Sequence, residues 1–206
     1  KRFGTLTAVC DLDLRVGPGE IFGFLGPNGA GKTTTIKLIT GLLKPTAGSI
    51  RVAGLDVATR TLEAKRAMGL VPDEPFVYPK LTGAEYLRFI GELYGGPLAG
   101  MRKRVPELLE MFELAPWGGE LLESYSHGMR QKLVLAGILL HDPKVLVLDE
   151  PNNHLDLEAV AALGWALEDF KGTVIMAAHD RELLDEVATK IIAFEDDGIH
   201  FFNGPL

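Results

Sequence analysis

Short runs of apolar residues, bounded by turn residues, alternate with longer stretches in which apolar residues recur every three or four positions. The short runs predict buried strands and the longer stretches predict helices. The expected strands cover residues 20–25, 49–53, 68–71, 145–148, 173–177, 191–194 and 199–202. The expected helices cover residues 32–42, 84–94, 101–114, 128–140, 157–170 and 181–188.

Strands that alternate with helical crossovers predict an α/β fold with a mostly parallel sheet and helices on both faces. The β character disappears between Pro75 and about Leu122, where two expected helices flank Gly95-Gly96-Pro97. We interpret this segment as a helical lobe inserted into the α/β layer. The expected organisation is one domain over residues 1–206, with an α/β lobe at 1–74 and 123–206 and a helical lobe at 75–122.

Composition narrows the class of protein. The 206 residues suit one domain with a sizeable core, and the content of 47% hydrophobic and 24% charged residues is that of an ordinary globular protein. The longest apolar stretch, residues 132–140, is about half the length of a membrane span, so we expect none. The first residues carry no apolar export signal, and both chain ends are expected to be trimmed.

The charge argues against nucleic-acid binding, and the cysteine content fits a reducing cytosol. The net charge is −7, and the longest basic run is the triplet Arg102-Lys103-Arg104, so general nucleic-acid binding is disfavoured. The one cysteine, Cys10, is expected to be a small core residue rather than a reactive thiol. A reducing compartment fits that composition.

The strongest chemical motif lies between the strand at 20–25 and the helix that follows, and it matches G-x-x-x-x-G-K-[ST]. Glycines let backbone N–H groups wrap phosphates, and the helix N-terminus adds partial positive charge. Lys32 is expected to reach the β- and γ-phosphates, and the Thr33 hydroxyl to ligate Mg²⁺. The predicted residues that bind ATP here are Gly26, Pro27, Asn28, Gly29, Ala30, Gly31, Lys32, Thr33 and Thr34.

Two further strands end in residues that can act on a metal and a water molecule. The strand at 145–148 is followed by Asp149 and Glu150, which fall at the carboxyl end of the sheet, where ligands bind. Asp149 suits a Mg²⁺ shell, and Glu150 suits the general base for the attacking water; alternatively, both cap the next helix. His179 follows the strand at 173–177 and is expected to contact the γ-phosphate, or else to begin a helix.

A third motif, Tyr125-Ser126-His127-Gly128-Met129-Arg130-Gln131-Lys132, opens a helix about twenty residues before Asp149. With the two motifs above, this order resembles the ATP-binding-cassette (ABC) family, whose signature is usually Leu-Ser-Gly-Gly-Gln. The resemblance implies a P-loop NTPase fold with N-terminal antiparallel strands. It also implies a head-to-tail dimer of cassettes, homomeric or heteromeric.

The resemblance assigns further roles by position. Ser126 and the Gly128 backbone would bind the γ-phosphate held by the partner cassette, and Ser126 would also serve as an N-cap. Phe3 matches the aromatic residue that stacks on adenine, with a plain core phenylalanine as the alternative. Residues 152–156, Asn-Asn-His-Leu-Asp, match the loop that touches the partner, although Asp156 is equally read as an N-cap.

The sequence departs from the family pattern in two places. The signature carries Tyr125, His127 and Met129 where Leu, Gly and Gln are usual, a variant similar to one found in some exporter-type cassettes. Asp73 stands where the family usually has a glutamine near Mg²⁺ and the water. A carboxylate can ligate Mg²⁺ but cannot donate an amide N–H. We therefore expect slower or differently coupled hydrolysis.

Two function classes follow from the resemblance. The first is the ATPase subunit of a membrane transporter, peripheral at the cytoplasmic face through a permease. Its apolar Phe76, Val77, Tyr78 and Leu81 would receive that partner, or else pack inside the helical lobe. The second is a ribosome-associated ATPase of the ABC-F type, which residues 152–156 and 179–192 resemble. ABC-F chains, however, carry two cassettes and a long linker. An ATP-binding clamp with little turnover is a third possibility, which Asp149, Glu150 and His179 argue against.

Overall fold

The structure, a computed structural model, describes residues 1–95, 98–151, 167, 170–179, 184, 187–195 and 198–204. Its strands are β1 (Arg2–Phe3), β2 (Leu6–Thr7), β3 (Ile21–Leu25), β4 (Arg51–Val52), β5 (Leu55–Asp56), β6 (Met68–Val71), β7 (Val145–Asp149), β8 (Thr173–Ala178), β9 (Lys190–Glu195) and β10 (Gly198–Asn203). Its α-helices are α1 (Lys32–Ile39), α2 (Thr61–Arg66), α3 (Gly83–Leu93), α4 (Leu98–Met111) and α5 (His127–Leu139). Two 3₁₀ helices are η1 (Ala115–Trp117) and η2 (Leu122–Ser124).

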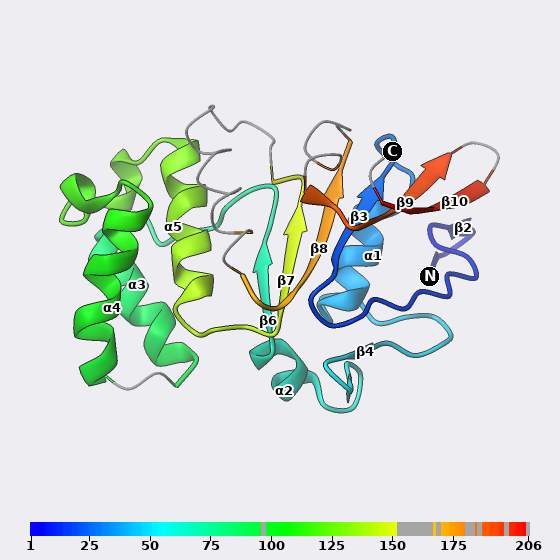
Figure 1. The fold of residues 1–206 in the computed structure, drawn as a ribbon, viewed down its shortest axis with the longest axis horizontal. Helices are drawn as coiled ribbons and strands as arrows, with labels where there is room; N and C mark the ends of the chain where they lie inside the picture. The colour runs from blue at the N-terminus through cyan, green and yellow to red at the C-terminus, as the bar shows by residue number, and fades with distance from the viewer. Residues whose placement is uncertain are drawn as a thin grey trace. The chain divides into compact units, whose positions relative to one another are not determined.

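Six strands form the central sheet in the order β10-β9-β3-β8-β7-β6 (Figure 1). β3 pairs in parallel with β8 and β9, β7 pairs in parallel with β8, and β10 is antiparallel to β9. Two small antiparallel pairs, β1–β2 and β4–β5, come from the N-terminal part of the chain. The predicted mostly parallel sheet with N-terminal antiparallel strands is therefore confirmed.

Within the described residues, the chain divides into two compact units. The first unit comprises residues 1–70, 144–152 and 170–206, and the second unit comprises residues 71–143 and 153–169. The second unit thus includes α5, which the sequence assigned to the α/β lobe. The predicted lobe boundaries at 75 and 122 stay a prediction.

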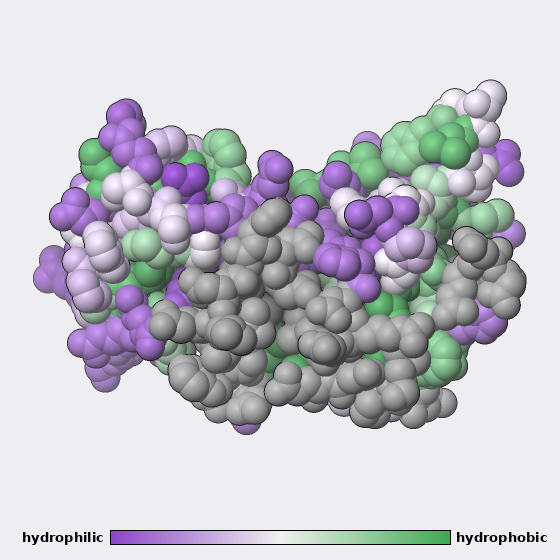
Figure 2. Space-filling model, turned by 90° about the horizontal axis from the view of Figure 1, so that it is seen from above, coloured by the Kyte–Doolittle hydropathy of each residue, from purple (hydrophilic) through white to green (hydrophobic). Residues whose placement is uncertain are grey.

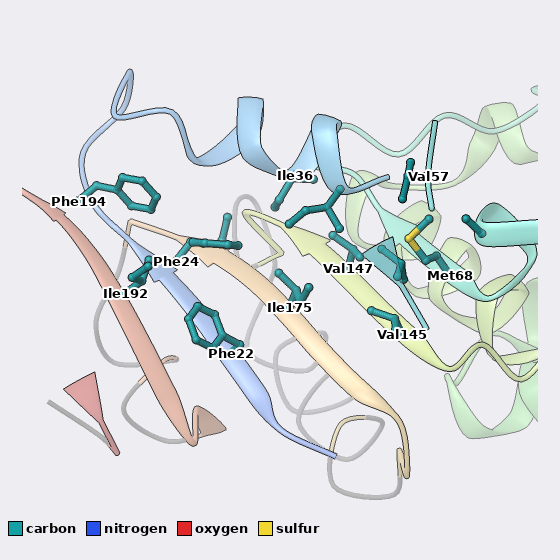
Figure 3. Close-up of a cluster of buried hydrophobic side chains, with 14 residues drawn as sticks. Phe22, Phe24, Ile36, Val57, Met68, Val145, Val147, Ile175, Ile192 and Phe194 are labelled. Atoms are coloured by element: carbon teal, nitrogen blue, oxygen red, sulfur yellow. The ribbon is translucent and has the colours of Figure 1, made fainter. Parts of the chain in front are cut away.

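The core of the first unit lies between α1 and one face of the sheet. Alternate strand residues point to this face, among them Phe22 and Phe24 of β3 and Val145 and Val147 of β7 (Figure 3). Ile36 of α1 packs against them. The opposite face is buried too, because Leu146, Leu148, Val174 and Met176 are almost fully covered. Burial on both faces is what a parallel sheet with apolar strands requires.

The second unit is built around α3, α4 and α5, which pack against one another. α3 begins with a capping box, in which the Thr82 hydroxyl accepts the Glu85 N–H and the Glu85 carboxylate accepts the Thr82 N–H. At Gly91 of α3, a Cβ atom would lie 2.2 Å from the Met101 sulfur and 2.5 Å from Leu140 Cδ2. Glycine at this position therefore lets the helices approach closely.

Several expectations needed correction. The helix α2 and the strand β5 were not predicted. They have six and two residues, which is too short for a clear periodic pattern in the sequence. Cys10 is exposed rather than buried, since it lies in the loop before β3 and its thiol contacts the Asp11 carboxylate at 3.3 Å. That contact raises the pKa of the Cys10 thiol. The expected helices at 157–170 and 181–188 lie almost wholly outside the described residues.

Polar and apolar residues are interspersed on the described surface in the view of Figure 2, as is usual for globular proteins. Among the described residues, no helix is both long enough and apolar enough to cross a bilayer. The exposed large apolar side chains include Leu62, Phe76 and Leu93. Of these, Phe76 stacks edge to face on Tyr78.

Candidate functional site

The Gly-rich loop predicted to bind phosphate connects the end of β3 to the start of α1. Gly31 is the N-cap of α1 and has a left-handed backbone with φ of 100°. A Cβ atom there would also lie 2.7 Å from the Ala8 carbonyl oxygen, so position 31 has to be glycine. The loop therefore turns tightly onto the N-terminus of a helix, where backbone N–H groups and the helix dipole favour anions.

Lys32, the first residue of α1, has its ammonium group turned into the loop. Nζ donates to the carbonyl oxygens of Gly26 at 2.6 Å and Pro27 at 3.1 Å, and it lies 3.2 Å from Glu150 Oε1. The lysine is only 4% exposed. A buried ammonium is stable because these oxygen atoms surround it.

Asp149 ends β7 and contacts the next residue of the loop. The Thr33 hydroxyl donates to Asp149 Oδ1 at 3.1 Å, so the two predicted Mg²⁺ ligands lie side by side although they are 116 residues apart in the chain. Asp149 is 6% exposed. Hydroxyl and carboxylate oxygens are the ligand types that Mg²⁺ prefers.

Glu150 is held by both of its carboxylate oxygens. Oε1 faces Lys32 at 3.2 Å, while Oε2 accepts the His179 backbone N–H at 3.0 Å and lies 2.8 Å from His179 Nδ1. The residue adopts φ of 50°, which is uncommon for a side chain other than glycine, and its own N–H donates to Ala177 O. Such a backbone is typical of functional positions, where surrounding contacts hold an unfavourable conformation.

His179 follows β8 and is about half exposed. Its Nδ1 faces the Glu150 carboxylate, which favours the tautomer with a proton on Nδ1 and leaves Nε2 for another partner. The structure thus brings Lys32, Thr33, Asp149, Glu150 and His179 into one connected set within the first unit. This set combines a phosphate-binding cation, oxygen ligands for a metal and a carboxylate for proton transfer.

The remaining loop residues differ in exposure. Pro27, Asn28, Gly29 and Thr33 are exposed, whereas Ala30 and Thr34 are partly buried and Gly31 is buried.

Phe3 lies in β1 and is 45% exposed, with Lys1 Nζ 4.9 Å from its ring centre. A plain core phenylalanine is therefore excluded, because the ring is open to solvent. Adenine stacking on Phe3 stays a prediction.

The other predicted site residues belong to the second unit. Asp73 lines a cavity of about 480 Å³ together with Glu74, Pro75, His127 and Arg130. Ser126 is the exposed N-cap of α5, and its hydroxyl accepts the Met129 N–H at 3.2 Å. The N-cap role predicted for Ser126 is thus present. Gly128 lies in the first turn of the same helix.

The motif spacing did not predict two side-chain contacts of the site. Neither the ion pair of Lys32 with Glu150 nor the contact of Glu150 with His179 follows from motif spacing, because both depend on side-chain conformation. The adjacency of β3, β7 and β8 was the available signal for them. The predicted partner loop Asn152–Asp156 lies outside the described residues.

A glycine-rich loop that presents a lysine to carboxylates at the end of a parallel strand defines the class of P-loop nucleoside triphosphatases. The family model described as "ABC transporter" matches residues 9–153, and the chain belongs to that family. The family expectation from the sequence is therefore confirmed.

Relatives and solved structures agree with this membership. The chain is 38% identical over 194 residues to the daunorubicin resistance ATP-binding protein DrrA3 of Streptomyces coeruleorubidus, covering 93% of this chain and 61% of that protein. It is 35% identical over 199 residues to the Nod factor export ATP-binding protein I of Paraburkholderia xenovorans (strain LB400), covering 95% and 66% respectively. The chain thus spans between about three fifths and two thirds of the length of these relatives.

Two solved structures have the same fold. An ATP-binding subunit of an ABC transporter superposes with a TM-score of 0.90 at 28% identity, covering 98% of this chain and 85% of that one. CbiO1 of Clostridium perfringens, part of the transporter complex cbiONQ, superposes with a TM-score of 0.82 at 24% identity, covering 95% and 82%, which supports the fold alone. None of these comparisons supports the ABC-F alternative.

Proposed function

We propose that this chain is the ATP-binding and ATP-hydrolysing subunit of an ABC transporter. It would work as a head-to-tail dimer that drives a transmembrane permease at the cytoplasmic face of the membrane. The observation that carries the proposal is the connected set around Glu150, which meets the phosphate-binding lysine on one side and His179 on the other.

The substrate in this proposal is ATP with its Mg²⁺ ion. Thr33 and Asp149 fit that ion, because their oxygens already lie 3.1 Å apart at the mouth of the loop. Among the described residues, no group of three or more His, Cys, Asp or Glu side chains could hold a metal. Two protein ligands nevertheless suffice for Mg²⁺, which takes its other ligands from nucleotide phosphates and water. When bound, the ion neutralises phosphate charge.

Hydrolysis would proceed by attack of water on the γ-phosphorus. Glu150 takes the proton of that water, the bond between the γ-phosphorus and the β–γ bridging oxygen breaks, and ADP and phosphate are released. Lys32 stabilises the charge on the transferred group once its ammonium turns from Glu150 to phosphate oxygens. His179 keeps Glu150 oriented through the bond to Oε2.

The second cassette would complete the site through α5. Ser126 is exposed and caps a helix of 13 residues, so its hydroxyl proton and the Gly128 N–H would bind the γ-phosphate held by a partner's Lys32. A two-fold symmetric arrangement satisfies both sites at once. Asp73 would stand near the metal and the water, in place of the usual glutamine. Phe3 would stack on the adenine ring.

An aromatic surface on the second unit suits the permease. Phe76, Tyr78 and Phe89 stack edge to face, with ring centres 5.7 Å and 5.3 Å apart, and Phe76 is 75% exposed. Val77 between them is buried, so packing within the second unit accounts for this residue, whereas Phe76 and Tyr78 are exposed and would be open to a partner. Three exposed aromatic rings in contact are typical of a protein-binding surface. An apolar helix end of the permease is the occupant that we propose.

The relatives at 38% and 35% identity are named for drug resistance and Nod factor export. We therefore propose export as the direction of transport. The substrate would be selected by the permease, since selectivity in such systems depends on the site that meets the substrate and not on the fold of the ATPase.

Co-purification with a membrane protein tests this proposal. The full protein is expected to co-purify with a multi-span membrane protein and to hydrolyse ATP faster in its presence. Co-sedimentation with ribosomes, and no stimulation by the membrane protein, would favour the ABC-F type instead.

A further inference from the structure

The signature segment of this chain starts with a tyrosine where the family usually has a leucine. The Tyr125 ring is buried, with 3% of the residue exposed, and its hydroxyl donates to the Trp117 carbonyl oxygen at 2.7 Å. A leucine could fill the same apolar space but could not make this bond. Burial, followed by the nearby Glu120, raises the pKa of Tyr125, so the hydroxyl stays protonated and able to donate at neutral pH.

Gly83 makes room for this hydroxyl. A Cβ atom at position 83 would lie 2.4 Å from Tyr125 Oη, which no real contact allows. Without the hydroxyl, the nearest atoms would be Tyr125 Cζ at 3.4 Å and Gly118 Cα at 3.5 Å, which are ordinary contacts. Gly83 is the first residue of α3, so the bond of Tyr125 lies where α3, η1 and the start of α5 meet.

Backbone bonds join the same segments. The Leu122 N–H donates to Leu81 O at 2.9 Å, and the Glu123 N–H donates to Pro79 O at 3.1 Å. Arg130 of α5 reaches back to Leu122 O at 3.3 Å. The segment before α5 is therefore held against the segment before α3. The segment before α3 carries Phe76 and Tyr78, two of the three rings of the aromatic surface.

We propose that Tyr125 is a positioning residue, whose hydroxyl fixes the neighbouring Ser126 relative to the start of α3. The inference rests on the proposed function, because Ser126 acts only when a partner cassette presents its nucleotide. Tyr125 itself touches no nucleotide. Its effect is to hold the N-cap of α5 in one place, so that the charge-stabilising contact is ready when the dimer closes.

Three variants of the full protein test the proposal: Tyr125→Phe, Gly83→Ala and the double variant. Tyr125→Phe keeps the ring and removes only the hydroxyl, and we expect kcat to fall about fivefold, the factor for one lost buried hydrogen bond. The Kd for Mg-ATP should not change, because the phosphate-binding loop belongs to the first unit. A purely structural role would lower the Tm without lowering kcat per mole of bound nucleotide.

The pair of variants tests the geometry separately. Gly83→Ala should be poorly folded because its methyl group meets the Tyr125 hydroxyl, and adding Tyr125→Phe should restore folding and activity to the level of Tyr125→Phe alone. Tyr86→Phe is the matched control, since Tyr86 is a buried tyrosine of the same helix α3, and it should keep the wild-type kcat.

The outcomes separate this inference from the proposed function. Wild-type kcat in Tyr125→Phe, or a Gly83→Ala variant that folds and works normally, would overturn the role of Tyr125 while ATP hydrolysis still stands. A wild-type protein that binds ATP without turnover would overturn the proposed function, and the inference with it.

Discussion

The buried charged side chains of the candidate ATP site and the side chains predicted to meet partners differ in their exposure to solvent. In the first unit, Lys32, Asp149 and Glu150 are each at most 6% exposed and already engaged in polar contacts. In the second unit, Phe76 is 75% exposed and Ser126 lies on the surface as an N-cap. The chemistry of the first unit is therefore preorganised within one chain, whereas the roles proposed for the second unit need a partner.

Removing the loop lysine should have the largest effect. Lys32→Ala deletes the cation expected to hold the β- and γ-phosphates, and it leaves Glu150 buried without its ion pair. We expect nucleotide affinity to fall about 100-fold or more, as for loss of charged hydrogen bonds, and turnover to disappear. Isothermal titration with Mg-ATP measures the affinity.

Lys37→Ala is the matched control for that variant, because Lys37 is an exposed lysine of the same helix α1. It should bind Mg-ATP like the wild type. Equal loss of affinity in both variants would mean that α1 needs its lysines for charge alone, and would contradict a specific role for Lys32.

Breaking the aromatic surface should weaken the response to the permease without disabling the candidate ATP site of the first unit. Phe76→Ser removes an exposed ring, so folding and hydrolysis by the isolated protein should change little. Stimulation of hydrolysis by the permease should fall about tenfold, as for an interface hot spot. Leu62→Ser is the control, since Leu62 is 76% exposed but belongs to α2 of the first unit. Full stimulation in Phe76→Ser would rule out this docking surface.

Replacing Asp73 tests a departure from the family pattern. Asp73→Gln supplies the amide N–H that a carboxylate lacks, so we expect turnover to rise about fivefold, the value of one hydrogen bond. Glu74→Gln, which alters the neighbouring wall of the same cavity, is the control. If turnover and permease stimulation are unchanged in Asp73→Gln, the identity of this residue does not limit hydrolysis.

The capping box of α3 gives the smallest expected effect. Glu85 accepts the Thr82 N–H and hydroxyl at 2.9 Å and 3.0 Å, and these bonds, the backbone one first, lower its pKa below the ordinary 4.5. A carboxyl group whose pKa is lowered by folding stabilises the fold above its unfolded pKa, and that contribution is lost as the pH falls through the folded pKa.

The Tm difference between wild type and Glu85→Ala should therefore be largest at neutral pH and shrink below pH 4.5. Glu92→Ala, which changes another exposed glutamate of α3, provides the comparison in the same thermal melts. A Tm difference for Glu85→Ala that is the same at every pH would show that the charge of Glu85 does not contribute.

The sequence could predict the first unit well because its motifs are local. The strand before Gly26 and the strand before Asp149 are continuous apolar runs, and adjacent parallel strands bring their carboxyl ends to one edge. The engagement of Glu150 with both Lys32 and His179 could not be predicted, since it depends on a left-handed backbone at Glu150.

The second unit was harder to predict from sequence. Phe76, Val77 and Tyr78 form one apolar run, yet Val77 is buried while its neighbours are exposed, because successive side chains of an extended segment point in opposite directions. The hydroxyl of Tyr125 and the space left by Gly83 are 42 residues apart, and only the packed fold brings them together. In the first unit, the prediction that Cys10 is buried was wrong, because apolar neighbours in a loop do not ensure burial.

The most direct test of the account is Glu150→Gln, with bound nucleotide, turnover and oligomeric state measured on one sample. If Glu150 is the general base beside a phosphate-binding lysine, the variant should still bind Mg-ATP, lose turnover by at least about 100-fold and accumulate as a nucleotide-bound dimer. A Glu150→Gln protein that remains monomeric and hydrolyses ATP at the wild-type rate would contradict the central claim.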